Sequence, residues 1–198
     1  REMMSRALVL AAKGRYTSSP NPTIGCVISI GDQIVGEGST RPSGGNHAEI
    51  EALNQVSDAA NSCVYVTLEP CSHQGKTGPC ALALIEARVA RVVIACEDPN
   101  PVVAGSGIKL LQEAGIEVEC GLLEDQAREV NKGFFKRHEH GLPWVLVKMA
   151  ASMDGRTAMA SGQSQWVTTP ASRQDVQRLR AASCAIITGI GTQLMDDP

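Results

Sequence analysis

Helix-like and strand-like stretches alternate along the first 140 residues of the chain. Helical spacing of apolar residues or helix-start and helix-stop signals predict helices over 3–13, 47–56, 80–88, 106–114 and, as a polar helix, 123–137. β-Branched and apolar runs predict strands over 24–30, 33–38, 62–68, 89–95 and 116–120, the first two joined as a hairpin through Gly31-Asp32. This order predicts an α/β domain with a mixed sheet between helices.

A second part of the chain begins after Gly141-Leu142-Pro143, where we place a domain boundary. We therefore expect one domain over 1–143 and a second part over 144–198. The second part has strand-like runs over 144–149 and 184–188, with a helix between them that Thr169-Pro170 opens. Two strands and one helix are too few to enclose a hydrophobic core by themselves. This part should therefore pack on the first domain, exchange with another copy, or belong to a longer protein.

The charge and composition of the chain argue against several classes of protein. Lys and Arg number 18 against 21 Asp and Glu, and no basic stripe is present, which argues against a nucleic-acid partner. No apolar run approaches the roughly 20 residues that cross a bilayer, and the first residues do not read as a secretory leader. The seven cysteines are odd in number and several lie inside apolar runs, which predicts thiols in a cytoplasmic protein.

The candidate chemistry lies in His47, Cys71 and Cys80, with Glu49 beside the first. A hydrolytic zinc site needs three protein ligands and one open position for water, and one imidazole with two thiolates fits that need. Zinc lowers the pKa of bound water to about 7, and a neighbouring carboxylate must then accept and deliver a proton. The sequence thus predicts Zn²⁺ on these three ligands and Glu49 as the acid–base residue.

Helix geometry adds a constraint on this site. His47 and Glu49 are two residues apart and do not share a helix face, so both reach one site only if the helix begins there. Cys80 follows Pro79 at a predicted helix start, where the dipole favours a thiolate. Singly, such residues usually pack in cores or lie on surfaces. Together they match the zinc-deaminase signature, except that eight residues separate the two cysteines.

That insertion carries His73 and Lys76, which suit an anionic or carbonyl-bearing ligand, although a solvated loop is the alternative. With these residues in view, the chain resembles the bifunctional deaminase/reductases of riboflavin biosynthesis. The motifs that carry the resemblance are the stretches 19–26, 45–49, 69–80, 97–107, 148–155, 161–166, 179–181 and 189–198. The family pattern T-P-P-C reads Thr77-Gly78-Pro79-Cys80 here.

The resemblance implies a cytidine-deaminase-like three-layer α/β/α domain, followed by the start of a dihydrofolate-reductase-like α/β domain. It implies deamination of 2,5-diamino-6-(ribosylamino)pyrimidin-4-one 5′-phosphate, and NADPH-dependent ribose reduction in full-length proteins. Implied substrate contacts in the first domain are Asn21, His73, Lys76, Asp98 and Asn100. In the second domain they are Ser164 and Arg180, with Ala150, Trp166, Thr192 and Asp196 for the dinucleotide.

Other functions stay open from the sequence. The same zinc chemistry serves deaminases of nucleobases, nucleosides or transfer RNA, and the acidic balance with few aromatic residues disfavours RNA. A structural zinc module would need a fourth ligand, for which His73 is the nearby candidate. The histidines at 138 and 140 are expected on a solvated helix face. We expect a deaminase whose reductase part is incomplete, and the chain could form a homo-oligomer.

Overall fold

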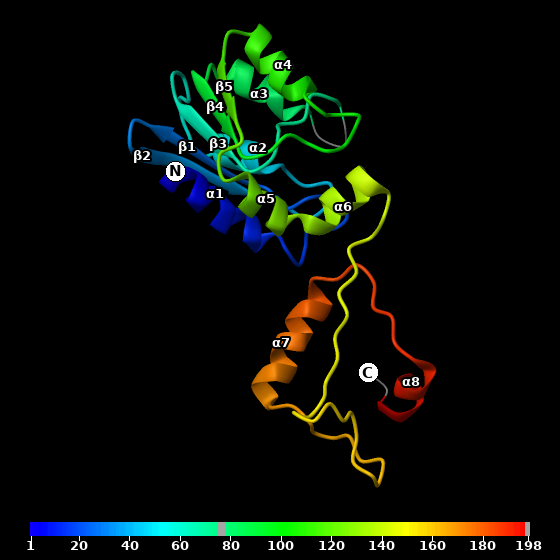
Figure 1. Cartoon of the computed structure of the whole chain (residues 1–198). Helices are drawn as coiled ribbons and strands as arrows, with labels where there is room; N and C mark the ends of the chain where they lie inside the picture. The colour runs from blue at the N-terminus through cyan, green and yellow to red at the C-terminus, as the bar shows by residue number, and fades with distance from the viewer. Residues whose placement is uncertain (75–77, 197–198) are drawn as a thin grey trace. The chain divides into compact units, whose positions relative to one another are not determined.

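The computed structural model describes residues 1–74 and 78–196, which fall into two compact units, 1–144 and 145–198. In the first unit, helices and strands follow the order α1 (Glu2–Lys13), β1 (Gly25–Ile30), β2 (Gln33–Ser39), α2 (Ala48–Leu53), β3 (Cys63–Val66), α3 (Cys80–Glu86), β4 (Arg91–Ile94), α4 (Ser106–Glu113), β5 (Glu117–Cys120), α5 (Glu124–Val130) and α6 (Lys132–His140) (Figure 1).

The strands form one five-stranded mixed sheet in the order β2-β1-β3-β4-β5. β1 pairs antiparallel with both β2 and β3, while β3, β4 and β5 run parallel. The expected hairpin and the expected mixed sheet are therefore confirmed. Val92, Val93 and Ile94 in β4 are all buried, as a strand covered on both faces requires.

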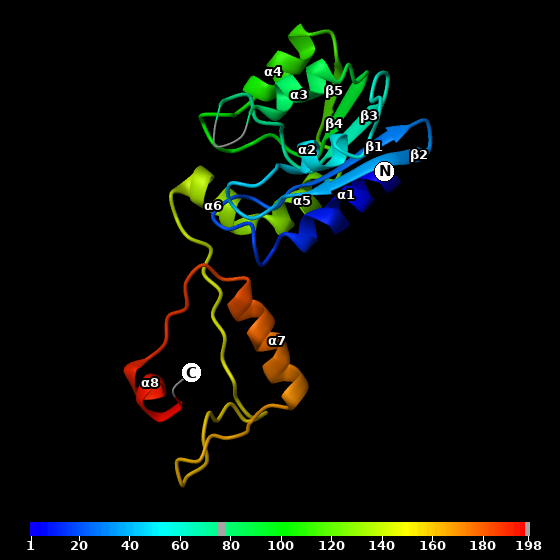
Figure 2. The same ribbon diagram turned by 180° about the vertical axis from the view of Figure 1, so that it is seen from behind.

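Successive side chains along the strands point to opposite faces of the sheet and pack into two separate hydrophobic cores, one on each face. Cys26 and Ile28 pack with residues of α2, α3 and α4, whereas Val27 packs with Met4 of α1 and Ala127 of α5. Figures 1 and 2 show the same division, with α3 and α4 on one side of the sheet and α1 and α5 on the other. The first unit is thus a three-layer α/β/α sandwich.

A glycine on strand β2 lets helix α2 lie directly against the sheet. A Cβ atom added at Gly38 would meet the backbone oxygen of Ala48 at 1.9 Å. Because Ala48 is the first residue of α2, this close contact fixes where along strand β2 that helix begins. The chemistry-bearing residues His47 and Glu49 flank the same point.

The prediction of one polar helix over 123–137 is wrong in one respect, because the structure has two helices, α5 and α6, in this stretch. Asn131 separates α5 from α6 with φ −116° and ψ 25°. Its side chain accepts a hydrogen bond from Thr23 N at 2.8 Å and donates one to Thr23 O at 2.8 Å. The side chain is used for this buried contact, which holds the end of α5 and the start of α6 against the segment before β1.

In the second unit, the described residues form α7 (Pro170–Ala181) and α8 (Ile190–Asp196) and no strand. Thr169 caps α7 by accepting a hydrogen bond from Ser172 N, so the predicted helix is confirmed. The predicted strands at 144–149 and 184–188 are wrong for the described chain. Val147 and Ile187 are 77% and 97% exposed, because no described strand pairs with these runs. Among the described helices, none combines the length and apolar character needed to cross a membrane.

Candidate active site

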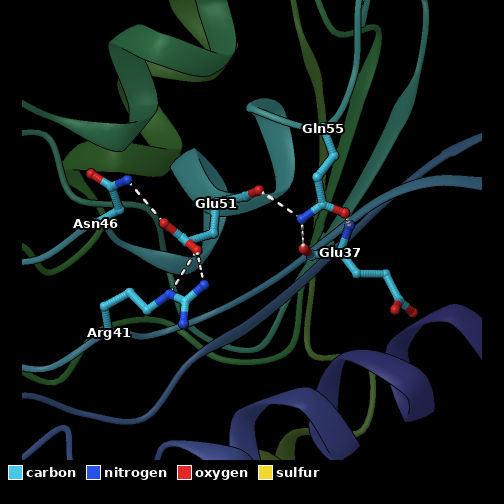
Figure 3. A network of polar contacts seen from close by, with 5 residues as sticks. All are labelled: Glu37, Arg41, Asn46, Glu51 and Gln55. Atoms are coloured by element: carbon cyan, nitrogen blue, oxygen red, sulfur yellow. Dashed lines mark hydrogen bonds and ion pairs between the residues drawn. The ribbon is translucent and has the colours of Figure 1, made fainter.

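The site is built around the start of α2, where His47 is the N-cap residue with φ −72° and ψ 161°. The helix therefore does begin where the spacing of His47 and Glu49 required. The loop before it is tied to the helix by Glu51, whose carboxylate accepts hydrogen bonds from Arg41 Nε at 2.7 Å and Asn46 Nδ2 at 2.9 Å. Figure 3 shows this carboxylate between the two donors.

The same helix is fastened to the edge strand through Gln55, also drawn in Figure 3. Its amide nitrogen donates to the backbone oxygens of Glu37 at 2.5 Å and Glu51 at 2.9 Å. Its amide oxygen accepts from Glu37 N at 3.2 Å. Together these contacts fix both ends of a short helix, which by itself would be marginal.

Three side chains with metal-binding atoms converge at the start of α2. His47, Cys71 and Cys80 offer ligand atoms that all lie within 4.8 Å of one another. His47 Nδ1 lies 3.2 Å from Cys80 Sγ and 3.6 Å from Cys71 Sγ. Two ligands on a tetrahedral zinc, at bonds of about 2.0 and 2.3 Å, are separated by about 3.5 Å. The residues therefore fit a zinc ion with three protein ligands.

The protonation chemistry of this set also suits a metal. A hydrogen bond from Cys80 and the nearby His47 ring hold the pKa of Cys71 well below its ordinary value, which favours the thiolate form of Cys71. The hydrogen bond to Cys71, followed by burial, raises the pKa of Cys80. The contact with Cys71 likewise raises the pKa of His47. A cation in this place would favour deprotonation of both cysteines, because thiolates are the metal ligands.

Glu49 lies beside these ligands and is 1% exposed. Its Oε2 atom is buried and has no hydrogen-bond partner among the residues that the structure describes. Burial raises the pKa of Glu49 to about 7, and the negative charge of Cys71 acts in the same direction. A buried carboxyl with that pKa can both accept and release a proton near neutral pH.

A second buried carboxylate, Glu69, stands two residues before Cys71 and is 2% exposed. It accepts four backbone N–H groups at 2.8–3.2 Å, from Asp98, Gly105, Gly107 and Ile108. The strand end that leads to Cys71 is thereby joined to the loop before α4. Sequence reasoning gave Glu69 no role of its own.

The ligands open onto a cavity of about 480 Å³. Four of the five predicted first-domain substrate contacts line it, together with His47, Glu49 and Cys71; these four are Asn21, His73, Asp98 and Asn100. The fifth, Lys76, lies outside the described residues. The structure thus brings together residues from segments that are far apart in the sequence.

The expectation of a solvated face around position 138 is wrong for His138, which lines the cavity and is half-buried. Phe134 and Arg137 of the same helix line it as well. Residues three and four apart share one helix face, so this spacing was a signal that could have identified them. His140, in contrast, is exposed as expected.

The remaining predicted contacts lie in the second unit. Ser164, Trp166 and Thr192 are exposed, while Ala150 and Arg180 are half-buried. The Trp166 ring lies 4.2 Å from the guanidinium carbon of Arg173. For Asp196 the structure gives only its place at the end of α8.

Comparison with known proteins agrees with these features. The family model for the cytidine and deoxycytidylate deaminase zinc-binding region matches residues 1–96, and the RibD C-terminal domain model matches 143–198. The riboflavin biosynthesis protein RibD of Haemophilus influenzae is 55% identical over 98% of this chain, and that of Escherichia coli is also 55% identical over 98%. The chain belongs to the RibD family. It spans about half the length of these curated RibD relatives, 53% in each case.

Solved RibD structures have the same fold. Acinetobacter baumannii RibD matches all of this chain with a TM-score of 0.95 and 53% identity, and the match covers 56% of that structure. The deaminase/reductase of Thermotoga maritima matches all of the chain with a TM-score of 0.94 and 37% identity, covering 57% of that structure. The expected cytidine-deaminase-like fold of the first unit is therefore confirmed, and the match of the second unit to the RibD C-terminal model is consistent with the expected start of a reductase domain.

Proposed function

We propose that the first unit catalyses zinc-dependent hydrolytic deamination of 2,5-diamino-6-(ribosylamino)pyrimidin-4-one 5′-phosphate in riboflavin biosynthesis. The observation that carries this proposal is the buried Glu49 carboxylate, with an unpartnered oxygen in the described chain, next to a three-ligand metal set. A structural zinc site has no use for a carboxyl group placed in this way, whereas a hydrolytic site requires one.

His47, Cys71 and Cys80 would hold the zinc ion in this reaction. When bound, zinc lowers the pKa of a coordinated water and so supplies the nucleophile. Glu49 would accept a proton from the water and donate it to the departing amino nitrogen. Water and the ring amine are thereby converted to a ring carbonyl and ammonia, and Glu49 returns to its starting state.

The substrate contacts are proposed from the resemblance and from the walls of the cavity. Asn21, Asp98 and Asn100 offer amide and carboxylate groups that suit the donors and acceptors of a pyrimidinone. His73, and Lys76 beyond the described residues, would meet the anionic end of the ligand. A volume of about 480 Å³ lies within the range typical of small-molecule pockets.

For the second unit we propose the opening of an NADPH-dependent ribose reductase, since the RibD C-terminal model matches it. Ala150, Trp166, Thr192 and Asp196 would contact the dinucleotide, and Ser164 and Arg180 the substrate. We also propose a cytoplasmic location, because the seven cysteines are odd in number and several of them are buried. We propose association into a homo-oligomer as well, because many large apolar side chains of the second unit are exposed.

The alternatives are weaker on specific grounds. In the described chain the metal-binding cluster has three members and His73 is not among them, which disfavours a closed structural site. A transfer-RNA deaminase structure is 25% identical with a TM-score of 0.53. The net charge of −3 offers little attraction to a phosphate backbone.

The test is ammonia release from the diaminopyrimidinone ribotide by the zinc-loaded chain. Glu49→Gln should reduce the rate by roughly 10²- to 10⁴-fold, the usual contribution of a general acid–base. Glu113→Gln, a change at an exposed carboxylate on α4, is the matched control and should keep the wild-type rate. No release by the folded, zinc-bound wild type, or equal rates in the two variants, would contradict the proposal.

A further inference from the structure

Two segments that lie far apart in the sequence form two walls of the cavity. One is the stretch before β1, from which the lining residues are Pro20, Asn21, Pro22 and Ile24. The other is helix α6, from which the lining residues are Phe134, Arg137 and His138. Neither segment carries a residue of the metal-binding set. The separation of these two walls is therefore set by other contacts than those that hold the metal ligands.

The side-chain amide of Asn131 joins the two walls, although Asn131 is not among the described residues that line the cavity. It is 7% exposed and stands where α5 ends and α6 begins. Its Oδ1 atom accepts a hydrogen bond from Thr23 N and its Nδ2 atom donates one to Thr23 O, both at 2.8 Å. Its backbone oxygen accepts from Phe135 N at 3.1 Å, in the first turn of α6. One residue thus fixes both the start of α6 and its place beside the stretch before β1.

The stretch before β1 has further anchors of its own. Thr23 Oγ1 donates a hydrogen bond to Ala11 O in α1. Ile24 N donates to Thr40 Oγ1 at 2.8 Å, and Thr40 N donates to Ile24 O at 2.9 Å. This wall should therefore keep its place when the contacts of Asn131 are lost.

Helix α6 is anchored differently. Its two ion pairs run to α5, where Arg128 holds Glu139 at 2.5 Å and Glu129 holds Lys132 at 2.6 Å. Phe135 is buried in the core on that side of the sheet, which keeps the helix on the domain. Without the two hydrogen bonds to Thr23, α6 should remain folded, but its distance from the other wall would be less restricted.

We propose that Asn131 is a positioning residue of the deaminase, which holds α6 and the stretch before β1 at the separation that the substrate requires. This inference rests on the deaminase function proposed above. When fewer molecules have the two walls in place, the apparent affinity for the substrate falls by the same fraction. Once the substrate is bound the walls are in place, so proton transfer through Glu49 should proceed as before. Asn131 therefore acts on KM and not on kcat.

The test measures KM and kcat for ammonia release from the ribotide by the zinc-loaded chain. Asn131→Asp has the same shape and keeps an acceptor for Thr23 N, but it sets a second oxygen against Thr23 O. Asn131→Ala removes both contacts. Each variant should raise KM roughly 10-fold, as expected for one or two buried hydrogen bonds, and leave kcat and bound zinc near the wild-type values. Asn61→Asp makes the same chemical change at an exposed position outside the cavity lining and should alter none of these quantities.

The division between KM and kcat separates positioning from a general loss of stability. A smaller fraction of folded protein lowers the apparent kcat and leaves KM unchanged. A fall in kcat at the wild-type KM would therefore overturn the inference, and so would a wild-type KM in both Asn131 variants.

Hydrogen exchange followed by mass spectrometry tests the positioning without the reaction. The backbone amides of α6 should exchange faster in Asn131→Ala than in the wild type, because a segment opens more easily when its contacts are lost. Those of α2 and β3 should exchange as before. This result would support the role of Asn131 even if the wild type released no ammonia, in which case only the proposed reaction fails. Unchanged exchange in α6, or faster exchange throughout the first unit, would overturn the inference.

Discussion

Replacement of Glu69 by Gln tests whether one carboxylate joins the metal-binding loop to the cavity wall. Glu69 Oε1 accepts N–H groups from Gly107 and Ile108, and Oε2 accepts those of Asp98 and Gly105. Gln keeps one acceptor oxygen and turns an NH₂ group towards the other pair. Two backbone donors thus lose their partner, at about 1–3 kcal/mol each, so we expect a loss of about 3 kcal/mol in the free energy of unfolding.

The assay is thermal unfolding followed by circular dichroism at a fixed zinc concentration, because bound metal itself raises the melting temperature. A loss of this size should lower Tm by roughly 6–12 °C for a domain of this length. Glu97→Gln changes a neighbouring exposed carboxylate and should shift Tm by no more than about 1–2 °C. Equal shifts in the two variants would refute the reasoning, since they would show that the four contacts contribute nothing specific.

Three further changes have defined outcomes. Gly38→Ala should destabilise the first unit by about 2 kcal/mol or more and weaken zinc binding, because its Cβ would meet Ala48 O at 1.9 Å. Gly133→Ala on α6, with its nearest atom at 3.9 Å, should unfold at a urea concentration no lower than that of the wild type, because Ala favours a helix over Gly. Asp98→Asn should raise Tm at pH 7, because burial raises the pKa of Asp98 and makes its charged form costly in the folded state. The gain in Tm should shrink as the pH falls towards 4, where the wild-type carboxyl is protonated as well. A gain in Tm that did not depend on pH would exclude this cause. Cys71→Ser should leave less than one zinc per chain after dialysis, as measured by metal analysis, and full retention of zinc would remove Cys71 from the ligand set.

Much of the first unit could be predicted from its sequence, because local signals and tertiary packing agree there. Gly31-Asp32 specified a hairpin that the structure contains, and the two-residue spacing of His47 and Glu49 required a helix start at that point. The alternation of strands and helices then predicted the mixed sheet. These are short-range patterns whose physical cause lies within a few residues.

The remaining features depend on contacts between distant segments. The break between α5 and α6 comes from Asn131 bonding to Thr23, 108 positions away, which no local pattern reveals. Glu69 has its role because the loop before α4 turns four N–H groups towards it. The run over 144–149 has strand-forming residues but no described partner strand, and pairing is what makes such a run a strand. The sequence alone predicts a solvated face for His138, because the cavity that His138 lines is formed by segments that only the fold brings together.

The proposed deaminase activity of this chain should depend on one zinc ion held by His47, Cys71 and Cys80. The most direct measurement is to remove the metal with a chelator, return zinc in steps, and follow both bound zinc and ammonia release from the ribotide. Bound zinc and the rate should rise together and level off at one zinc per chain, whereas Cys80→Ser should show neither rise. Ammonia release by the metal-free chain, or one bound zinc per chain without any release, would contradict the claim.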